Sequence, residues 1–506
     1  MKTYLEYLKE ISADDLLEGL LGYGLFAEKI PGFLTAEQFY KFYLDQKKPV
    51  FKQEGKDFIR YESMRNTNAP RELSIPNPFT YANLCNNLAD QWSNIIKHFE
   101  SNTRHETYKI SRIHLRKLRG RKHLFEMNYK AFSLDGQPEQ KIIVRNRFKV
   151  EADISSCFPS IYSHSISWSL VGKKNAKKTR HDKTKWYNIL DFNLRNIKNG
   201  ETNGLLIGPH VSNLISEVVL CVVDKNLWDK GYHFVRNIDD YSCYTSTMED
   251  AEKFILDLAS ELKEFELRLN VKKTKISSLP ISLITNWVNR LNKFPIGEKL
   301  AEDGKQIFEY KKLKGFMDLS IELMLEEKNS AILNYAIKVI SGKYLGKNSI
   351  NYYTNLIHHL VLIYPYLILS IEECLFDAFS TSKESKIEIT KDIFNLGVEK
   401  RFYEACSYSL FWILKYNLDL KIPSMHDDAL KSDDCIFLLL GYLVAEKDKN
   451  EIEIQKYQSK AEVLKKTEFD RYWLFIYECL PALKLEGDFR ILKNNKVSFI
   501  KDAYIF

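Results

Sequence analysis

The stretch "FVRNIDDYSCYTS", residues 234–246, places two aspartates between two short runs that are rich in aromatic and branched side chains. Runs of this kind separated by only two residues are typical of a β-hairpin. Asp239 and Asp240 are therefore predicted at the tip of a hairpin. Aspartate is common in turns, so the pair gains significance only from a second site upstream.

That second site is "FKVEADISSCFPS", residues 148–160, in which apolar and polar residues alternate up to Ile154. Alternation with a period of two predicts a strand that carries Asp153 on its polar face and is ended by Pro159. One carboxylate at a strand end and two on a hairpin tip suit phosphoryl or nucleotidyl transfer assisted by two Mg²⁺ ions, with Mn²⁺ as an alternative. Such ions activate the attacking oxygen, stabilise the leaving pyrophosphate and neutralise the like charges of the carboxylates.

Two further segments fit this chemistry, although each is weak by itself. "NGLLIGPHVSNLISEVVL", residues 203–220, predicts a loop that enters a long apolar helix and lets the backbone approach a base or sugar. The alternative for this loop is ordinary packing at a helix entry. Downstream, "LNVKKTKI", residues 269–276, puts Lys273 where a cation could meet a triphosphate, although a lone lysine is usually a surface residue.

Composition limits the class of protein. A chain of 506 residues with 45% hydrophobic residues is long enough for about two to four domains with sizeable cores. Because no window approaches ~18 uncharged apolar residues, and the N-terminus mixes charges into its apolar positions, we expect a cytoplasmic protein that does not enter a membrane. The eight cysteines form no CxxC pair, so neither a disulfide framework nor a zinc site is indicated.

Basic residues are concentrated in two clusters. Residues 104–122 contain eight Lys or Arg and one Glu, and residues 173–185 contain seven Lys or Arg and one Asp. A basic run by itself is usually a solvated face. Two such clusters flanking the carboxylate-bearing strand favour a polyphosphate partner instead.

The organisation along the chain is mixed and then helical. Residues 1 to about 60 are predicted to be helical, and from about residue 73 to about 315 helical segments alternate with strand-like runs. Beyond that point the strand pattern disappears and successive amphipathic or buried helices are predicted. They suggest an α-helical repeat array, although no fixed period is present.

The order and spacing of four stretches resemble one known family. "DISSCF", "NGLLIGP", "NIDDY" and "LNVKKT" are similar to motifs A to D of the reverse-transcriptase palm. More narrowly, "IPNP", "PSIYSHSISW", "GLLIGPHVSNLISE" and "NWVNRLNKF", within residues 70–295, resemble the abortive-infection (Abi) phage-defence reverse transcriptases. The resemblance implies an α+β fold, with a fingers/palm domain and its N-terminal helical segment over residues 1–315. An all-α helical-repeat domain over residues 316–506 would take the place of a thumb.

The resemblance also implies roles for individual residues. Asp153 and Asp239 would bind both metals, Asp240 would complete the carboxylate triad, and the backbone carbonyl of Ile154 would be a further ligand. Phe158 occupies the steric-gate position, which implies deoxynucleotide substrates. The incoming-nucleotide loop would be lined by Asn203, Gly204, Gly208 and Pro209, with Asn203 where many relatives have Gln. Lys273 would protonate pyrophosphate, with Lys272 and Lys275 as alternatives, and the fingers would hold triphosphate with Arg112, Arg116 and Lys117.

For function, the Abi resemblance implies protein-primed DNA synthesis from dNTPs without a defined template, in antiphage defence. The DNA product would be attached covalently to the protein, and the chain would form a homo-oligomer. Two departures from other reverse transcriptases agree with this: Asn237 stands where an aromatic residue is usual, and no RNase H segment is recognised. The priming hydroxyl is expected on an N-terminal tyrosine, with the candidates Tyr4, Tyr7, Tyr23, Tyr40 and Tyr43.

Two other functions remain open at this stage. One is a templated reverse transcriptase that copies a dedicated RNA. The other is a non-catalytic RNA-binding scaffold that retains a relic palm, against which the intact Asp153, Asp239, Asp240 and Lys273 argue.

Overall fold

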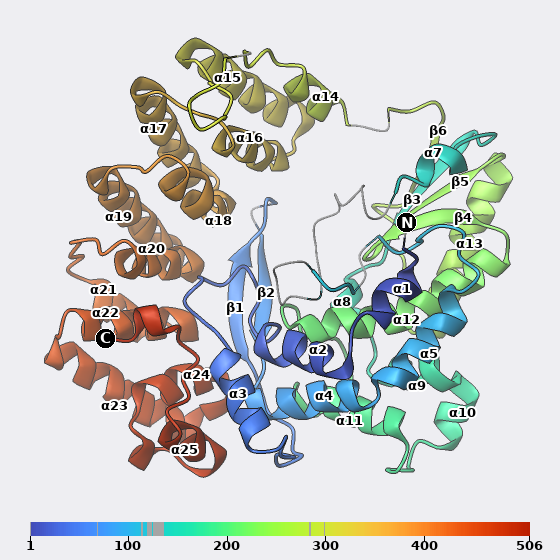
Figure 1. Cartoon of the computed structure of the whole chain (residues 1–506), viewed down its shortest axis with the longest axis horizontal. Coiled ribbons are helices and arrows are strands. Elements are labelled where there is room, and N and C mark those ends of the chain that lie inside the picture. The colour runs from blue at the N-terminus through green and yellow to red at the C-terminus, as the bar shows by residue number, and fades with distance from the viewer. Residues whose placement is uncertain are drawn as a thin grey trace.

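The computed structural model describes residues 2–67, 69–112, 115–118, 124, 136–282, 285–297 and 299–506 (Figure 1). The chain starts with short helices, as predicted: α1 (Tyr4–Lys9), α2 (Ala13–Leu17) and α3 (Glu37–Asp45). Capping boxes begin the first two, because Thr3 and Ser12 each exchange hydrogen bonds with the acidic residue three positions later. A hairpin of β1 (Ile59–Met64) and β2 (Pro70–Ile75) follows.

Two helices lead from this hairpin toward the central sheet. α4 (Pro78–Asp90) is capped by the Asn77 side chain and has proline at its first position, where no backbone N–H is required. α5 (Trp92–Thr103) follows directly and packs against the later helix α12 (His210–Asp229). The "IPNP" stretch is therefore a helix start.

The central sheet has four antiparallel strands in the order β4-β5-β3-β6. They are β3 (Phe148–Asp153), β4 (His233–Asn237), β5 (Asp240–Thr245) and β6 (Lys275–Ser278). The register places Asp153 of β3 directly opposite Asp240 of β5. α13 (Met248–Glu264) packs on β3 and β5 through a buried stripe of Ala251, Phe254, Leu258 and Leu262.

Helices fill the connection between β3 and α12. In order they are α8 (Cys157–Ser160), α9 (His164–Val171), α10 (Lys173–Lys178) and α11 (Trp186–Asn196), whereas α7 (Glu139–Ile142) lies before β3. α12 is buried along most of its length between α5, α9 and α13. The sheet is thus backed by α13, which in turn packs on the buried α12.

From residue 285 onward the described residues form helices joined by loops, with only isolated β-bridges. The longer helices are α15 (Tyr310–Glu327), α16 (Ala331–Ser341), α17 (Lys347–Ile363), α19 (Lys383–Lys400), α20 (Tyr403–Lys415), α22 (Cys435–Lys447), α23 (Glu451–Thr467) and α24 (Phe469–Cys479). The shorter ones are α14 (Asn286–Asn292), α18 (Ile368–Ile371), α21 (Met425–Lys431) and α25 (Gly487–Asn494). Figure 1 shows this series descending on the side opposite the central sheet. The predicted α+β fold class is confirmed.

The predicted domain boundary at residue 315 falls inside helix α15. Because a boundary within a continuous helix separates residues that share hydrogen bonds, we propose that the division lies before Tyr310. The helices on its C-terminal side also share a core with the N-terminal segment. Leu34 bridges Ile500, the Thr35 N–H donates to the Phe499 carbonyl at 2.8 Å, and the Phe39 and Phe499 rings lie 5.6 Å apart.

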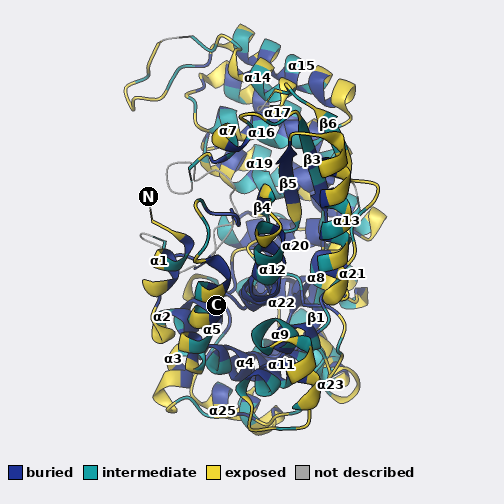
Figure 2. Cartoon of the chain, turned by 90° about the vertical axis from the view of Figure 1, so that its right-hand side faces the viewer, coloured by how far each residue is buried: buried dark blue, intermediate teal, exposed yellow. Residues whose placement is uncertain are grey.

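Burial follows the same arrangement. Figure 2 shows buried residues in β3, β5 and α22, whereas α13 and α15 carry exposed outer faces. All eight cysteines are buried and unpaired, in agreement with the absence of a disulfide framework. Across the described ranges, every helix falls short of the length and apolarity that crossing a membrane requires.

Candidate active site

Three carboxylates meet where β3 and the β4-β5 hairpin end. Asp153, Asp239 and Asp240 each offer an oxygen, and these oxygens lie within 4.8 Å of one another. Asn237 pairs with Asp240, so the two turn residues are Ile238 and Asp239, and Asp240 is the first residue of β5. The prediction that both aspartates sit in the turn was wrong by one residue, because the strand register extends to Asp240.

The turn has an unusual backbone. Ile238 has a φ of 56°, a left-handed conformation that is costly for a β-branched residue. Two hydrogen bonds hold it: Arg236 Nη1 donates to the Ile238 carbonyl at 2.8 Å, and the Ile154 N–H donates to the Asp239 carbonyl at 3.1 Å. The strained turn that positions Asp239 is thus fixed from both sides.

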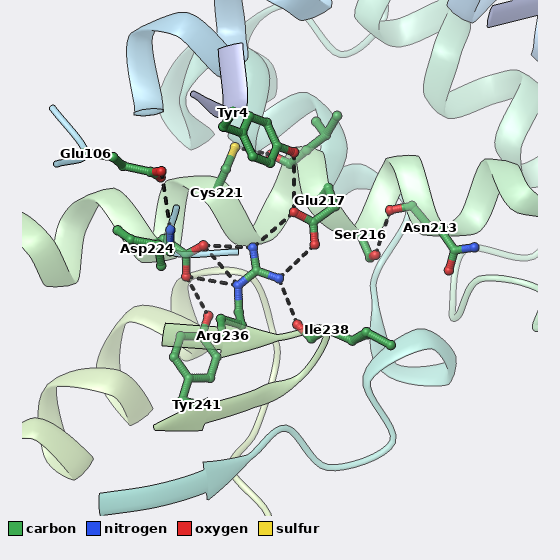
Figure 3. A network of polar contacts seen from close by, with 12 residues as sticks. Tyr4, Glu106, Asn213, Ser216, Glu217, Cys221, Asp224, Arg236, Ile238 and Tyr241 are labelled. Atoms are coloured by element: carbon green, nitrogen blue, oxygen red, sulfur yellow. Dashed lines mark hydrogen bonds and ion pairs between the residues drawn. The ribbon is translucent and has the colours of Figure 1, made fainter. Parts of the chain in front are cut away.

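Arg236 belongs to a buried polar network (Figure 3). Its side chain is fully buried, and its guanidinium contacts Glu217 Oε1 at 2.8 Å and Asp224 Oδ2 at 2.8 Å, both on α12. Tyr241 on β5 donates to Asp224 Oδ1 at 3.1 Å. The network therefore joins both strands of the hairpin to α12, a connection that sequence reasoning missed because it depends on tertiary packing.

The electrostatics of the triad favour a bound cation. Burial and the charge of Asp153 raise the pKa of Asp239, and burial and the charge of Asp239 raise the pKa of Asp240 to about 6. Each shift means that the negative charges are poorly neutralised by the protein itself. Three clustered carboxylate oxygens are the hard ligands that Mg²⁺ or Mn²⁺ prefers, so the donor set fits a divalent metal.

Ile154 lies beside the triad, directly after β3. Its N–H is used by Asp239, and it forms an isolated bridge with Leu269. The role of its carbonyl as a metal ligand stays a prediction.

Lys273 is the lysine that contacts the triad. Its Nζ donates to Asp153 Oδ2 at 2.7 Å, and this hydrogen bond raises the pKa of the ammonium. Lys275 pairs instead with Glu151 at 3.0 Å, and Lys272 is exposed. Asn270, which the sequence did not single out, donates to Asp153 Oδ1 at 3.1 Å.

The predicted nucleotide loop is tied to the predicted steric gate. Phe158 lies in α8, and its carbonyl accepts a hydrogen bond from the Leu205 N–H at 2.7 Å. Gly204 has a φ of 82°, and a Cβ there would lie 2.7 Å from the Pro159 carbonyl oxygen, so a side chain is excluded. Gly208 also has a positive φ of 125°, Pro209 precedes α12, and Asn203 is exposed.

The predicted fingers residues lie in different surroundings. Arg112 and Arg116 are buried, and the Arg112 N–H donates to the Arg236 carbonyl at 2.8 Å, next to the hairpin. Lys117 Nζ contacts Asp15 Oδ1 on α2 at 2.8 Å. Residues 113–114 and 119–122 of the first basic cluster lie outside the described residues, so triphosphate binding there stays a prediction.

The five candidate priming tyrosines differ in accessibility. Tyr4 and Tyr43 are buried, burial raises the pKa of both phenols, and the Tyr4 hydroxyl contacts Glu217 Oε2 at 3.5 Å. Tyr7 is buried next to Lys109, whose Nζ lies 4.5 Å from its ring centroid. Tyr23 and Tyr40 are partly exposed. Tyr23 precedes Gly24, whose carbonyl accepts from the His210 N–H at 2.9 Å, next to the nucleotide loop.

Solved structures that are similar to this chain include telomerases of two Candida species. Two apo structures from Candida tropicalis, one truncated at its C-terminal domain, have TM-scores of 0.28 and 0.32 with 12% and 10% identity, covering 49% and 72% of this chain. A Candida albicans telomerase in complex with a fragment of telomeric RNA has a TM-score of 0.29 with 10% identity, covering 73%. This chain spans 56%, 66% and 65% of those three chains, respectively.

No curated protein sequence matches the chain. Residues 93–346, which are half of the chain, match the family described as "Reverse transcriptase (RNA-dependent DNA polymerase)". This range contains the carboxylate triad, the predicted nucleotide loop and Lys273. The chain therefore belongs to the reverse transcriptase (RNA-dependent DNA polymerase) family.

Proposed function

We propose that the protein synthesises DNA from dNTPs, primed on its own side chain and without a defined template, in abortive-infection antiphage defence. The observation that carries the nucleotidyl-transfer part is the cluster of Asp153, Asp239 and Asp240 within 4.8 Å. These residues would hold divalent metal ions, which supply nucleophile activation and charge neutralisation when bound. The defence role and the priming mode rest on the Abi-like stretches within residues 70–295.

The residues around the triad have separate tasks in this proposal. Lys273, held by Asp153, would deliver a proton to the leaving pyrophosphate. Phe158 would fill the space beside C2′ of the incoming sugar and so select deoxynucleotides. The Gly204 backbone, which has no room for a side chain, would lie along the nucleotide.

The priming nucleophile is proposed to be a tyrosine hydroxyl, which a neighbouring divalent metal makes easier to ionise. Among the five candidates, Tyr23 is favoured because it is partly exposed and adjoins the nucleotide loop through Gly24. Self-association of the chain through its C-terminal helices is part of the same proposal.

Mass spectrometry of covalent adducts tests the priming mode. The full-length protein is incubated with dNTPs, trimmed with nuclease and digested with a protease. We expect a nucleotide adduct on a tyrosine, absent in Asp239→Asn and in Tyr23→Phe but retained in the control Tyr40→Phe. An adduct on another tyrosine would refute only the choice of Tyr23. DNA that separates fully from the polypeptide under denaturing conditions would refute protein priming and favour templated synthesis.

A further inference from the structure

A cavity of about 670 Å³ is lined mainly by residues of α9, α10 and α11 and of the loops that join them, and its size lies in the range of about 300–1,000 Å³ that is usual for ligand sites. Its aromatic lining consists of Tyr162, Trp168 and Phe192. Its basic lining consists of Lys177, Arg180, Lys183 and Arg195. Part of the second basic cluster (residues 173–185) thus forms one wall of the cavity.

Buried hydrogen bonds fix the walls. Asp191 is buried, and its Oδ2 lies 2.8 Å from His164 Nδ1 and 3.5 Å from Arg195 Nε. Asn188 Nδ2 donates to the carbonyls of Thr179 at 2.8 Å and Asp182 at 2.9 Å, on either side of Arg180. The basic residues are therefore presented by a wall that is organised before any ligand arrives.

The two acidic residues in the lining already have hydrogen-bond or ion-pair partners within the protein. Asp191 is paired with His164 and Arg195, as described above. Asp182 Oδ1 accepts from the Thr184 N–H at 2.9 Å and the Thr184 hydroxyl at 2.6 Å. Four basic side chains face these two acids, so the cavity retains a positive balance that suits an anionic ligand.

The cavity also adjoins the nucleotide loop. Tyr162 forms an isolated bridge with Asn203, and the Ser163 N–H donates to the Thr202 carbonyl at 2.8 Å. Tyr162 lies four residues after Phe158, the predicted steric gate. A strand of nucleic acid that leaves or enters the active site at this loop would meet the cavity next.

We propose that this cavity binds single-stranded DNA, with bases stacked on the aromatic lining and phosphates neutralised by the basic wall. Aromatic platforms combined with a cationic groove are the usual means of binding single strands, because every base has a face that can stack. A duplex does not expose those faces. The basic cluster continues along α10 beyond the cavity through Lys174 and Lys178, which suits a strand better than one nucleotide. The identity of the strand as DNA rests on the proposed function.

Binding is measured with Asp239→Asn, which carries no self-made product, and with a fluorescent oligo(dT) in EDTA. Lys177→Ala/Arg180→Ala removes two exposed cations from the cavity wall, and Lys311→Ala/Lys314→Ala removes two exposed cations of α15, which belong neither to the cavity nor to its basic cluster. We expect the first pair to weaken binding about tenfold more than the second pair. Because the first pair removes two phosphate contacts, it should also reduce the magnitude of the slope of log K against log salt by about 1.4, at ~0.7 for each contact.

Cross-linking locates the strand independently of synthesis. An oligonucleotide carrying 5-iododeoxyuridine is expected to cross-link to Tyr162, Trp168 or Phe192 in the same protein. Three results would overturn the proposal: equal binding by the two pairs of variants, cross-links confined to other regions, or equal affinity for duplex DNA. Displacement of the strand by an equimolar amount of dTMP would also overturn it, in favour of a free nucleotide. If no nucleotide adduct forms on the protein but these cross-links do, protein priming is refuted and the binding of a strand in the cavity is not.

Discussion

At the scale of residues, Arg236 has the largest structural task near the triad. Its guanidinium binds two carboxylates of α12 and the carbonyl of the strained Ile238, which precedes Asp239. The planar guanidinium spreads five donors over three nitrogens and reaches all three partners, whereas an ammonium offers three donors from a single nitrogen. Arg236 is therefore a positioning residue for the predicted metal site.

Substitution of Arg236 should separate folding from positioning. Arg236→Met leaves Glu217 and Asp224 buried and unpaired, so we expect the free energy of unfolding to fall by about 3–5 kcal/mol. Arg236→Lys keeps the charge and should fold, but with slower nucleotide incorporation and a higher Mg²⁺ concentration at half-maximal rate. The control Lys225→Met, a partly exposed residue of α12 that pairs with Asp229 rather than with the buried network, should change neither quantity by a comparable amount. An unchanged Mg²⁺ requirement in folded Arg236→Lys would refute the positioning role.

Phe158 provides a second prediction at this scale. Phe158→Ala opens space beside the sugar, so the ratio of CTP to dCTP incorporation should rise at least tenfold. Phe158→Tyr, which keeps the ring, should retain the preference for dCTP. The ring is partly buried, and its loss should cost about 3 kcal/mol or less. An unchanged ratio in folded Phe158→Ala would remove this residue from the gate.

At the scale of elements, Glu404 joins the C-terminal helices to the N-terminal hairpin. It lies on α20, is 1% exposed, and accepts from the Met64 N–H of β1 at 2.9 Å. Burial raises the pKa of this carboxyl to about 7. The folded pKa exceeds the unfolded value, so the neutral carboxyl of Glu404 makes its full contribution to the free energy of unfolding below about pH 4.5. This contribution is lost as the pH rises through about 7.

Glu404→Gln removes this titration and keeps a carbonyl that can accept from Met64. We expect the variant to exceed the wild type in free energy of unfolding by about 3 kcal/mol at pH 8 and to match it near pH 4. Chemical denaturation at both pH values measures the difference. Glu399→Gln, at an exposed position of α19, is the control. A difference that does not change with pH would contradict the assignment.

Some of these elements could be predicted from the sequence and others could not. The hairpin, the β3 strand and the loop before α12 were predictable, because period-two alternation and glycine positions are local signals. The turn was placed one residue late, because ladder register depends on the partner strand rather than on spacing. Asn270 and the Arg236 network were not predictable, since each contact joins segments that tertiary packing brings together.

At the scale of the whole molecule, the two ends of the chain share one core. Phe499, near the C-terminus, is fully buried, with its ring 5.6 Å from Phe39 and 5.0 Å from Trp473. This shared core was not predictable from the sequence, because no local pattern reports contact between residues more than 450 positions apart. The C-terminal helices therefore stabilise the N-terminal segment, which adjoins the predicted nucleotide loop.

Phe499→Ala tests this closure of the chain. The large cavity left in a shared core should lower the free energy of unfolding by about 3–5 kcal/mol. Phe506→Ala, at a position that is 51% exposed, should change it by less than about 0.5 kcal/mol. Equal stability of the two variants would show that the C-terminal segment does not contribute to the core.

The central claim is that three carboxylates from β3 and the hairpin form a two-metal nucleotidyl-transfer site. Asp239→Asn tests it most directly, because the change removes one charge and keeps the size of the side chain. Incorporation of labelled dNTPs with Mg²⁺ is measured beside Asp318→Asn, an exposed position on α15. We predict loss of at least a thousandfold in folded Asp239→Asn and wild-type incorporation in Asp318→Asn. Substantial dNTP incorporation by folded Asp239→Asn would contradict the account.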